Sequence, residues 1–281
     1  MTPSHKVTIN RRKQQVTYYD EVLPGDVTLR MMQIPGGTFL MGSPKDEIDN
    51  YEDESPQHQV TVKGFFLAKY PVTQAQWRAV ATLPQVEIAL KTDPSNFKGA
   101  DRPMENVSWH EAVEFCARLL AHTGRQYGLP SEAQWEYACR AGTTTPFHFG
   151  ETITTDLANY RGTDDEKYDG SGSYGAGPKG EYREETTPVR LFEVANRFGL
   201  CDMHGNVWEW CADHWHNNYE GAPADGSAWL SDDDEAARVL KGGSWFYAPR
   251  VCRSASRFNY RPGGRVNGLG FRVSSLPPGL L

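Results

Sequence analysis

Apolar and polar residues alternate along residues 27–43, VTLRMMQIPGGTFLMGS. Alternation with a period of two is typical of half-buried strands, and the Pro and Gly residues at 35–37 are typical of a turn. A similar pattern returns in residues 58–70, HQVTVKGFFLAKY. The pattern therefore predicts one strand on each side of the turn and a second pair of strands over residues 58–70.

Three helices are predicted from their first residues. In each, a Ser or Thr is followed three residues later by a Glu or Gln, a reciprocal pair that satisfies free backbone N–H groups of the first turn. The pairs are Thr73 with Gln76, Ser108 with Glu111, and Ser131 with Gln134. After Ser108, apolar residues fall on one helical face and Gly124 follows as a stop. Cys116 lies on that face, so we expect it to be a buried small hydrophobic residue and not a nucleophile.

Two polar segments interrupt these patterns. Residues 46–57, DEIDNYEDESPQ, are expected to form a solvated loop. Residues 141–185 are rich in Gly, Thr, Asp and Tyr, cannot bury enough apolar area to form an element, and are expected to be a long surface loop. A last strand system is expected to begin at residues 239–245, VLKGGSW, and to close at residues 269–275, LGFRVSS.

These elements predict a single α+β domain whose terminal strands pair. Its regular elements should be few, because 27 glycines and 18 prolines in 281 residues favour irregular structure. We place the domain at residues 26–281 and expect residues 1–25 to be an N-terminal extension.

Composition and charge exclude several classes of function. The net charge of −7 argues against nucleic-acid binding, which needs a basic surface to displace counterions from phosphates. No run approaches the roughly 18 apolar residues of a membrane span, so we expect no membrane insertion. The first residues are polar and basic without a following apolar stretch, which predicts a cytoplasmic protein. Five cysteines, an odd number without a CxxC pair, favour neither a disulfide scaffold nor a structural zinc site.

Three histidines, His204, His214 and His216, lie close to tryptophans in the sequence. The last two form an HxH pair that could chelate a metal. Without a third ligand at a defined spacing, we expect them to be solvent-exposed loop histidines.

Seven motifs occur in order along the chain. They are IPGGTFLMGS, YPVTQAQW, RPMENVSWHEAVEFC, GLPSEAQWEYACRAG, FGLCDMHGNVWEW, KGGSW and GFRV. Together they resemble the formylglycine-generating enzyme (sulfatase-modifying factor) family, and the resemblance runs from about Met31 to Ser274. It implies the formylglycine-generating-enzyme type of C-type lectin fold, loop-rich with few regular elements.

The resemblance also bears on catalysis. Family members that make formylglycine oxidise a substrate cysteine with copper held by two cysteines, one shortly after GGS(Y/W) and the other five residues on. The corresponding positions here are Tyr247 and Cys252. Cys252 aligns better with a third family cysteine, in RCAAR, which pairs with the cysteine of WEYxC, here Cys139. One thiolate cannot replace two, so we expect no catalytic residues and no copper, and Cys139 and Cys252 should lie close together as thiols.

Calcium is the other ligand that the resemblance implies. Carried over, the family's calcium ligands are the Asp202 side chain, the carbonyls of Gly205 and Val207, and the Glu209 side chain, a set of hard oxygen donors that suits a structural calcium ion. The alternative is that Asp202 and Glu209 cap turns while the neighbouring tryptophans pack in the core.

Residues 242–272 combine aromatic residues, arginines and glycines in a mosaic. Framework-like residues alternate with positions of unrelated chemistry, which are Phe246, Tyr247, Ala248, Val251, Ser256, Phe258, Tyr260, Gly263, Gly264, Val266 and Gly268. This mosaic resembles the variable region of the target proteins of diversity-generating retroelements, some of which use this fold. In those systems template adenines are mutated, often in asparagine codons. Each of these positions is reachable from AAC or AAT by changing adenines alone.

Rigid aromatic area near arginines is typical of a binding surface with a low ordering cost. We expect Tyr247, Phe258 and Tyr260 to be exposed and Trp245 to be core. Arginines 250, 253, 257 and 261 are expected to hold the segment against carboxylates and backbone carbonyls.

The prediction is a monomeric, non-enzymatic ligand-binding protein, the variable target protein of such a retroelement, with an unknown protein or other ligand at its C-terminal face. One alternative is a formylglycine-generating or related metal-dependent oxidase with an altered site. The other is an accessory domain with one fixed protein partner, docked through the N-terminal extension.

Overall fold

The computed structural model describes residues 8–10, 12–167 and 170–276. Its largest sheet has five strands in the order β1-β2-β5-β11-β6. It contains strands from both ends of the chain, but the terminal strands do not pair as predicted, because β1 pairs with β2, and β11 pairs with β5 and β6. The strands are β1 (Tyr18–Leu23), β2 (Val27–Ile34), β5 (Phe65–Ala68), β6 (Tyr127–Gly128) and β11 (Ser274–Ser275).

Two smaller sheets complete the strand structure of the described residues. One has four strands in the order β10-β7-β8-β9, and the other pairs β3 with β4. The bounds are β3 (Gly37–Met41), β4 (His58–Val62), β7 (Trp208–His214), β8 (Arg238–Lys241), β9 (Arg257–Tyr260) and β10 (Leu269–Gly270). Two short 3-10 helices are η1 (Glu52–Glu54) and η2 (Pro249–Cys252).

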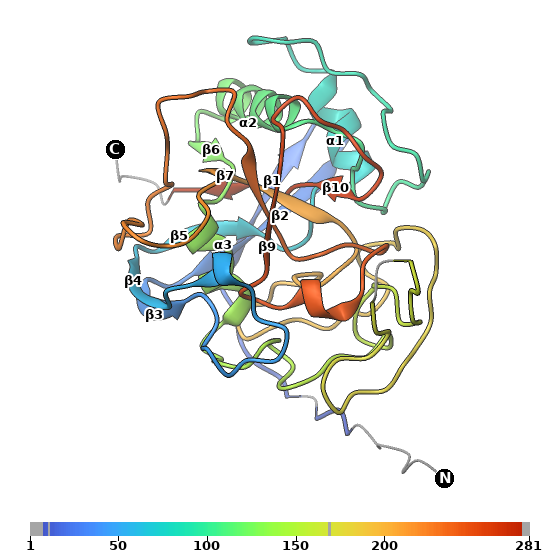
Figure 1. The fold of residues 1–281 in the computed structure, drawn as a ribbon. Helices are drawn as coiled ribbons and strands as arrows, with labels where there is room; N and C mark the ends of the chain where they lie inside the picture. The colour runs from blue at the N-terminus through green and yellow to red at the C-terminus, as the bar shows by residue number, and fades with distance from the viewer. Residues whose placement is uncertain (1–7, 11, 168–169, 277–281) are drawn as a thin grey trace.

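The three predicted helices are confirmed with their caps. They are α1 (Gln74–Ala81), α2 (Trp109–Thr123) and α3 (Glu132–Arg140), and each begins with a complete capping box. Gly124 ends α2 in the left-handed conformation, with φ of 71°. Helices α1 and α2 lie together at one end of the molecule, and the loops between α3 and β7 occupy the other (Figure 1).

The strands predicted in residues 27–43 and 58–70 are present, but the two strands of each predicted pair do not pair with each other. β2 pairs with β5, and β3 pairs with β4, so the chain leaves the large sheet after β2 and returns to it at β5. The two crossing points touch, because a Cβ atom on Gly36 would lie 2.9 Å from the Gly64 nitrogen. Glycine at residue 36 permits this close backbone approach.

The core and the element boundaries correct three further expectations. Residues 141–185 are not purely a surface loop, because Phe147, Tyr160 and Tyr174 in it are buried and form a small apolar cluster with Cys252. Part of the N-terminal extension belongs to the domain, since β1 is the edge strand of the large sheet. Strands β7 and β9 lie in segments where the sequence predicted no regular element. Among the described residues, no helix is long and apolar enough to cross a membrane.

Candidate functional site

An aromatic cluster lies where β7, β9 and the segment after β8 meet. Trp208 and Trp245 are buried and form its floor. Phe258 stacks on Trp208 with ring centroids 5.8 Å apart, and Tyr247 meets the same indole edge-on at 6.1 Å. Phe246 packs edge-on against both Trp245 and Tyr247. Tyr247 is 40% exposed and Phe258 45% exposed, so their outer faces are open to solvent. We call these five residues the aromatic face.

Local backbone geometry presents these side chains. Gly242 and Gly243 have φ of 97° and 74°, a conformation that favours glycine, and they turn the chain from β8 into Trp245. A Cβ atom on Gly243 would lie 2.4 Å from the Cys252 sulfur, so the turn packs tightly on η2. In β9 the side chains alternate, with Arg257 buried and Phe258 exposed.

The predicted ligand-binding positions divide by burial. Tyr247, Phe258, Gly263 and Val266 are exposed, while Phe246, Ala248, Val251 and Tyr260 are half-buried. The remaining three, Ser256, Gly264 and Gly268, are buried and do not belong to a binding surface. Gly264 is also sterically fixed, because a Cβ atom there would lie 2.2 Å from the Tyr260 ring. Trp245 is core, as expected.

Two further residues, which the sequence did not predict, extend the cluster. Phe97 meets the Trp245 indole edge-on at 5.3 Å, and Tyr182 stacks on it with centroids 6.1 Å apart. The guanidinium of Arg161 lies over the Tyr182 ring at 4.7 Å. These residues come from loops far from residue 245 in the sequence, and no local pattern distinguishes them.

The position of the family's first copper-binding cysteine is part of this face. Tyr247 borders a hollow of about 50 Å³ with Asp165, Arg250 and Val251, room for no more than about two water molecules. Cys252 is fully buried in the adjoining η2 helix, and burial raises the pKa of its thiol. No pair of thiolates is available there to hold a copper ion.

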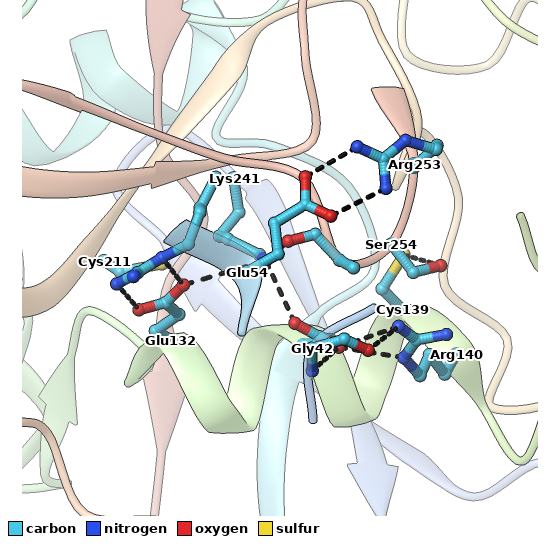
Figure 2. A network of polar contacts seen from close by, with 12 residues as sticks. Gly42, Glu54, Glu132, Cys139, Arg140, Cys211, Lys241, Arg253 and Ser254 are labelled. Carbon is cyan, nitrogen blue, oxygen red and sulfur yellow. Dashed lines mark hydrogen bonds and ion pairs between the residues drawn. The ribbon is translucent and has the colours of Figure 1, made fainter. Parts of the chain in front are cut away.

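Buried ion pairs hold the segment that carries the face, and Figure 2 shows the pair between Arg253 and Glu54. The Arg253 guanidinium donates to both oxygens of Glu54, at 2.6 and 2.8 Å, and to Glu47. Arg257 binds both oxygens of Glu132 at 2.9 and 2.8 Å. The expectation that arginines hold this segment on carboxylates is confirmed for these two, whereas Arg261 is exposed.

The same contacts correct the interpretation of residues 46–57 as a solvated loop. Glu54 is completely buried and the Glu47 side chain is nearly so, because both carboxylates pair with the buried Arg253. The pattern of charges could not reveal this, since the partner lies about two hundred residues away in the sequence.

Cys139 and Cys252 are unbonded thiols, as expected. The Cys139 sulfur lies 3.6 Å from the Ser254 hydroxyl. His204 lies between the two cysteines, with its ring 3.7 Å from the Cys139 sulfur and hydrogen-bonded to the Cys252 carbonyl at 2.7 Å. All five cysteines are unbonded and buried. Burial raises the pKa of Cys139 to about 12, so this thiol is not a nucleophile at neutral pH.

The histidines are not exposed loop residues. His204 and His214 are 1% and 2% exposed, and His216 stacks on Trp229 at 3.6 Å. Burial lowers the pKa of His204 to about 4, so its ring is neutral. Each packs as part of the core or against an aromatic ring, and among the described residues no group of three metal-binding side chains is found.

Residues of the calcium set already make internal contacts. Arg272 binds both oxygens of Glu209 at 2.6 Å, and the Trp135 indole donates to the same carboxylate at 2.7 Å. The Arg272 guanidinium also donates to the carbonyls of Cys201 and Asp202. The Gly205 carbonyl accepts the backbone N–H of Val207. Arg272 thus engages the Glu209 carboxylate, and an ion held by Asp202, Gly205, Val207 and Glu209 would have to displace it. One buried oxygen of Asp202 has no partner among the described residues, so the calcium set stays a prediction.

Comparison with protein families matches residues 23–275 to the sulfatase-modifying factor enzyme 1-like domain. The chain is 30% identical over 274 residues to the serine/threonine-protein kinase Pkn1 of Chlamydia trachomatis, covering 91% of this chain but only 39% of the kinase. It therefore spans about two fifths of the length of that relative. It is 28% identical over 292 residues to the formylglycine-generating enzyme of Mycobacterium tuberculosis, covering 84% of this chain and 91% of that enzyme.

Solved structures agree on the fold. PvdO from Pseudomonas aeruginosa superposes with a TM-score of 0.75 at 32% identity, over 95% of this chain and all of PvdO. Treponema denticola variable protein 1 superposes with a TM-score of 0.72 at 24% identity, over 94% of this chain and all of that one, which bears on the fold alone. The fold is thus the formylglycine-generating-enzyme type of C-type lectin fold. Because the family match covers nearly the whole chain, this protein belongs to the sulfatase-modifying factor enzyme 1-like domain family.

Proposed function

We propose that this chain is a non-enzymatic ligand-binding protein that binds through the aromatic face, and that it is the variable target protein of a diversity-generating retroelement. The observation that carries the proposal is the pair of exposed rings, Tyr247 and Phe258, supported from below by the buried Trp208. Large aromatic side chains held in one conformation lose little entropy when a partner covers them. Such residues dominate the energy of binding surfaces.

An oxidase is a poorer match for the same geometry. The chemistry of the family needs two thiolates that can reach a soft metal ion. Here Tyr247 stands at the first cysteine position, and Cys252 is buried with its pKa raised. The small hollow beside Tyr247 leaves no room for a substrate cysteine and a metal together.

Diversification is supported by a contrast between two kinds of position. Some are required by the scaffold, and others can change without disturbing it. Arg253, Arg257 and Arg272 are buried in ion pairs, so replacing them would unfold the scaffold. The aromatic positions between them can change without disturbing those pairs. The fold is compatible with such variation, because the Treponema denticola protein that shares it is described as a variable protein.

Sequencing codons 240 to 275 across sibling cultures of the source organism tests diversification. We expect substitutions at codons 247, 258 and 266 and none at codons 253, 257 and 272. An invariant segment would contradict diversification and leave a binding protein with one fixed partner.

Binding through the face is tested by selection of a displayed library of small protein loops on the immobilised protein. Most recovered clones should lose at least tenfold in affinity, about 1.4 kcal/mol, toward the double variant Tyr247→Ala/Phe258→Ala. The matched control is Tyr18→Ala/Leu230→Ala, which removes side chains that are 47% and 61% exposed on other elements. Clones that bind both double variants equally would show that the face is not the binding surface.

A second candidate is an accessory domain with one fixed partner. It is favoured by the relative Pkn1, in which a domain like this one forms only part of a longer protein. Deleting residues 1–17 while keeping β1 distinguishes the two functions. A docking role predicts that this deletion abolishes partner binding, whereas the aromatic face predicts no effect.

A further inference from the structure

The segment that carries the aromatic face differs in charge from the rest of the chain. Residues 236–281 contain no Asp or Glu, although the whole protein has a net charge of −7. The segment has eight basic residues, which are Arg238, Lys241, Arg250, Arg253, Arg257, Arg261, Arg265 and Arg272. The segment that carries the face therefore has a formal charge opposite in sign to that of the whole protein.

Half of these basic residues are neutralised inside the protein. Their partners come from other elements, and the pairs are Lys241 with Glu136, Arg253 with Glu54, Arg257 with Glu132, and Arg272 with Glu209. They form the scaffold and cannot meet a ligand.

Others remain at the surface beside the face. Arg261 is exposed and directly follows Tyr260 at the end of β9. Arg265 pairs with Glu111 while its side chain stays 49% exposed. Arg250 is half-buried and lines the hollow beside Tyr247. The acidic residue at that hollow, Asp165, is paired with Arg161. Arg261 thus presents an exposed guanidinium at this edge of the face.

The floor of the face holds an unsatisfied donor. Trp208 is 3% exposed, and its indole N–H has no acceptor among the described residues. The indole N–H groups of the other buried tryptophans, Trp77, Trp135, Trp210 and Trp245, each donate to a carbonyl or carboxylate. A buried donor without a partner is costly, and a ligand acceptor that reached it would recover part of that cost. The rings of Tyr247 and Phe258, both partly exposed, pack on the same indole.

We infer that the ligand is a protein segment in which an aromatic or aliphatic side chain is flanked by Asp or Glu. This inference rests on the proposed function of the aromatic face. The apolar side chain would cover Tyr247 and Phe258, and a carboxylate would bind Arg261 as a charge-assisted hydrogen bond. A backbone carbonyl or carboxylate oxygen would accept from Trp208. A glycan fits less well, because sugar hydroxyls also need acceptors, and residues 236–281 offer no carboxylate.

The displayed-loop selection described above also tests this inference. Clones that depend on Tyr247 and Phe258 should be enriched in Asp or Glu within two positions of an apolar residue. Repeating the selection on Arg261→Glu should abolish this enrichment or replace it with Lys and Arg. Lys63→Glu makes the same change of charge at an exposed residue away from the face and should leave the enrichment intact.

A substitution at the floor tests the donor. Trp208→Phe keeps an aromatic ring but removes the N–H, so it should weaken binding of a selected loop three- to tenfold. Thermal unfolding should show a moderate loss of stability with the fold retained, because Phe fills less of this buried site than Trp. Unchanged affinity with an intact fold would remove the donor from the inference.

The outcomes separate the two proposals. If no clone depends on Tyr247 and Phe258, the binding face itself is wrong. If clones depend on both residues but lack acidic enrichment, only the inferred ligand chemistry is wrong. Binding of a glycan array that depends on these two residues, with no protein loops selected, would likewise overturn the protein ligand while keeping the face.

Discussion

Single residues support the face through contacts that are fully buried. Glu105 is 0% exposed, and one of its oxygens accepts the backbone N–H of Phe97, whose ring packs on Trp245. Its other oxygen has no partner among the described residues. Burial raises the pKa of Glu105 to about 7, so a carboxyl group that is ordinarily charged stays partly protonated beneath the aromatic floor.

This shift predicts a pH dependence of stability. Between pH 4 and 7 the unfolded chain releases the Glu105 proton while the folded chain keeps it, so this residue makes the folded state less stable as pH rises. Glu105→Gln should remove that slope and make the variant more stable than the wild type by about 2 kcal/mol at pH 8, with little advantage at pH 4. Urea unfolding at both pH values measures it. An equal difference at pH 4 and 8 would show that Glu105 does not titrate in this range.

At the scale of elements, the segment with η2 and β9 is held to the first half of the chain by ion pairs. Arg253 follows η2 and meets Glu54 at the end of η1, while Arg257 begins β9 and meets Glu132 at the start of α3. These pairs fix the segment that carries Phe258 without using its exposed side chains. The face is therefore held rigidly where it joins the scaffold. Its exposed side chains can be substituted without breaking these ion pairs.

Breaking one of these pairs should be costly. Glu54→Gln leaves Arg253 buried with only Glu47 as a charged partner, and we expect a loss of about 3 kcal/mol in the free energy of unfolding. Lys98→Gln breaks the Lys98–Asp93 pair, in which both side chains are about half exposed, and should cost less than about 1 kcal/mol. Urea unfolding compares the two variants. Equal losses would mean that the buried pair contributes no more than a surface one.

At the scale of the whole molecule, the scaffold is stabilised by its own side chains where the family resemblance implies a metal. Arg272 links Glu209 in β7 of the four-stranded sheet to the Ala68 carbonyl in β5 of the large sheet. Its guanidinium supplies positive charge at the carboxylate that the resemblance assigns to calcium.

Calcium should therefore leave the stability of the protein unchanged. Adding millimolar calcium or a chelator is expected to leave Tm unaltered, because Arg272 already binds both oxygens of Glu209 in the folded state. Differential scanning calorimetry with magnesium as the control ion checks this. A Tm that rises with calcium and saturates would show that Arg272 yields Glu209 to the ion.

The sequence by itself determined the elements whose causes are local. Capping boxes located all three helices, alternation located β2 to β5, and seven motifs in order indicated the fold. Local patterns suffice for these features because a cap or an alternating strand involves residues only a few positions apart.

Only the tertiary structure decided which distant residues meet. Ser254 contacts Cys139, and Arg253 pairs with Glu54 in a segment that its sequence suggests is solvated. Arg272 pairs with Glu209, where the resemblance implies calcium. The tertiary structure also added Phe97 to the aromatic cluster. Each of these contacts joins segments far apart in the chain, and burial then changes the pKa or removes the exposure that a local pattern suggests. Long-range packing, which leaves no periodic trace in the sequence, thus defined the site.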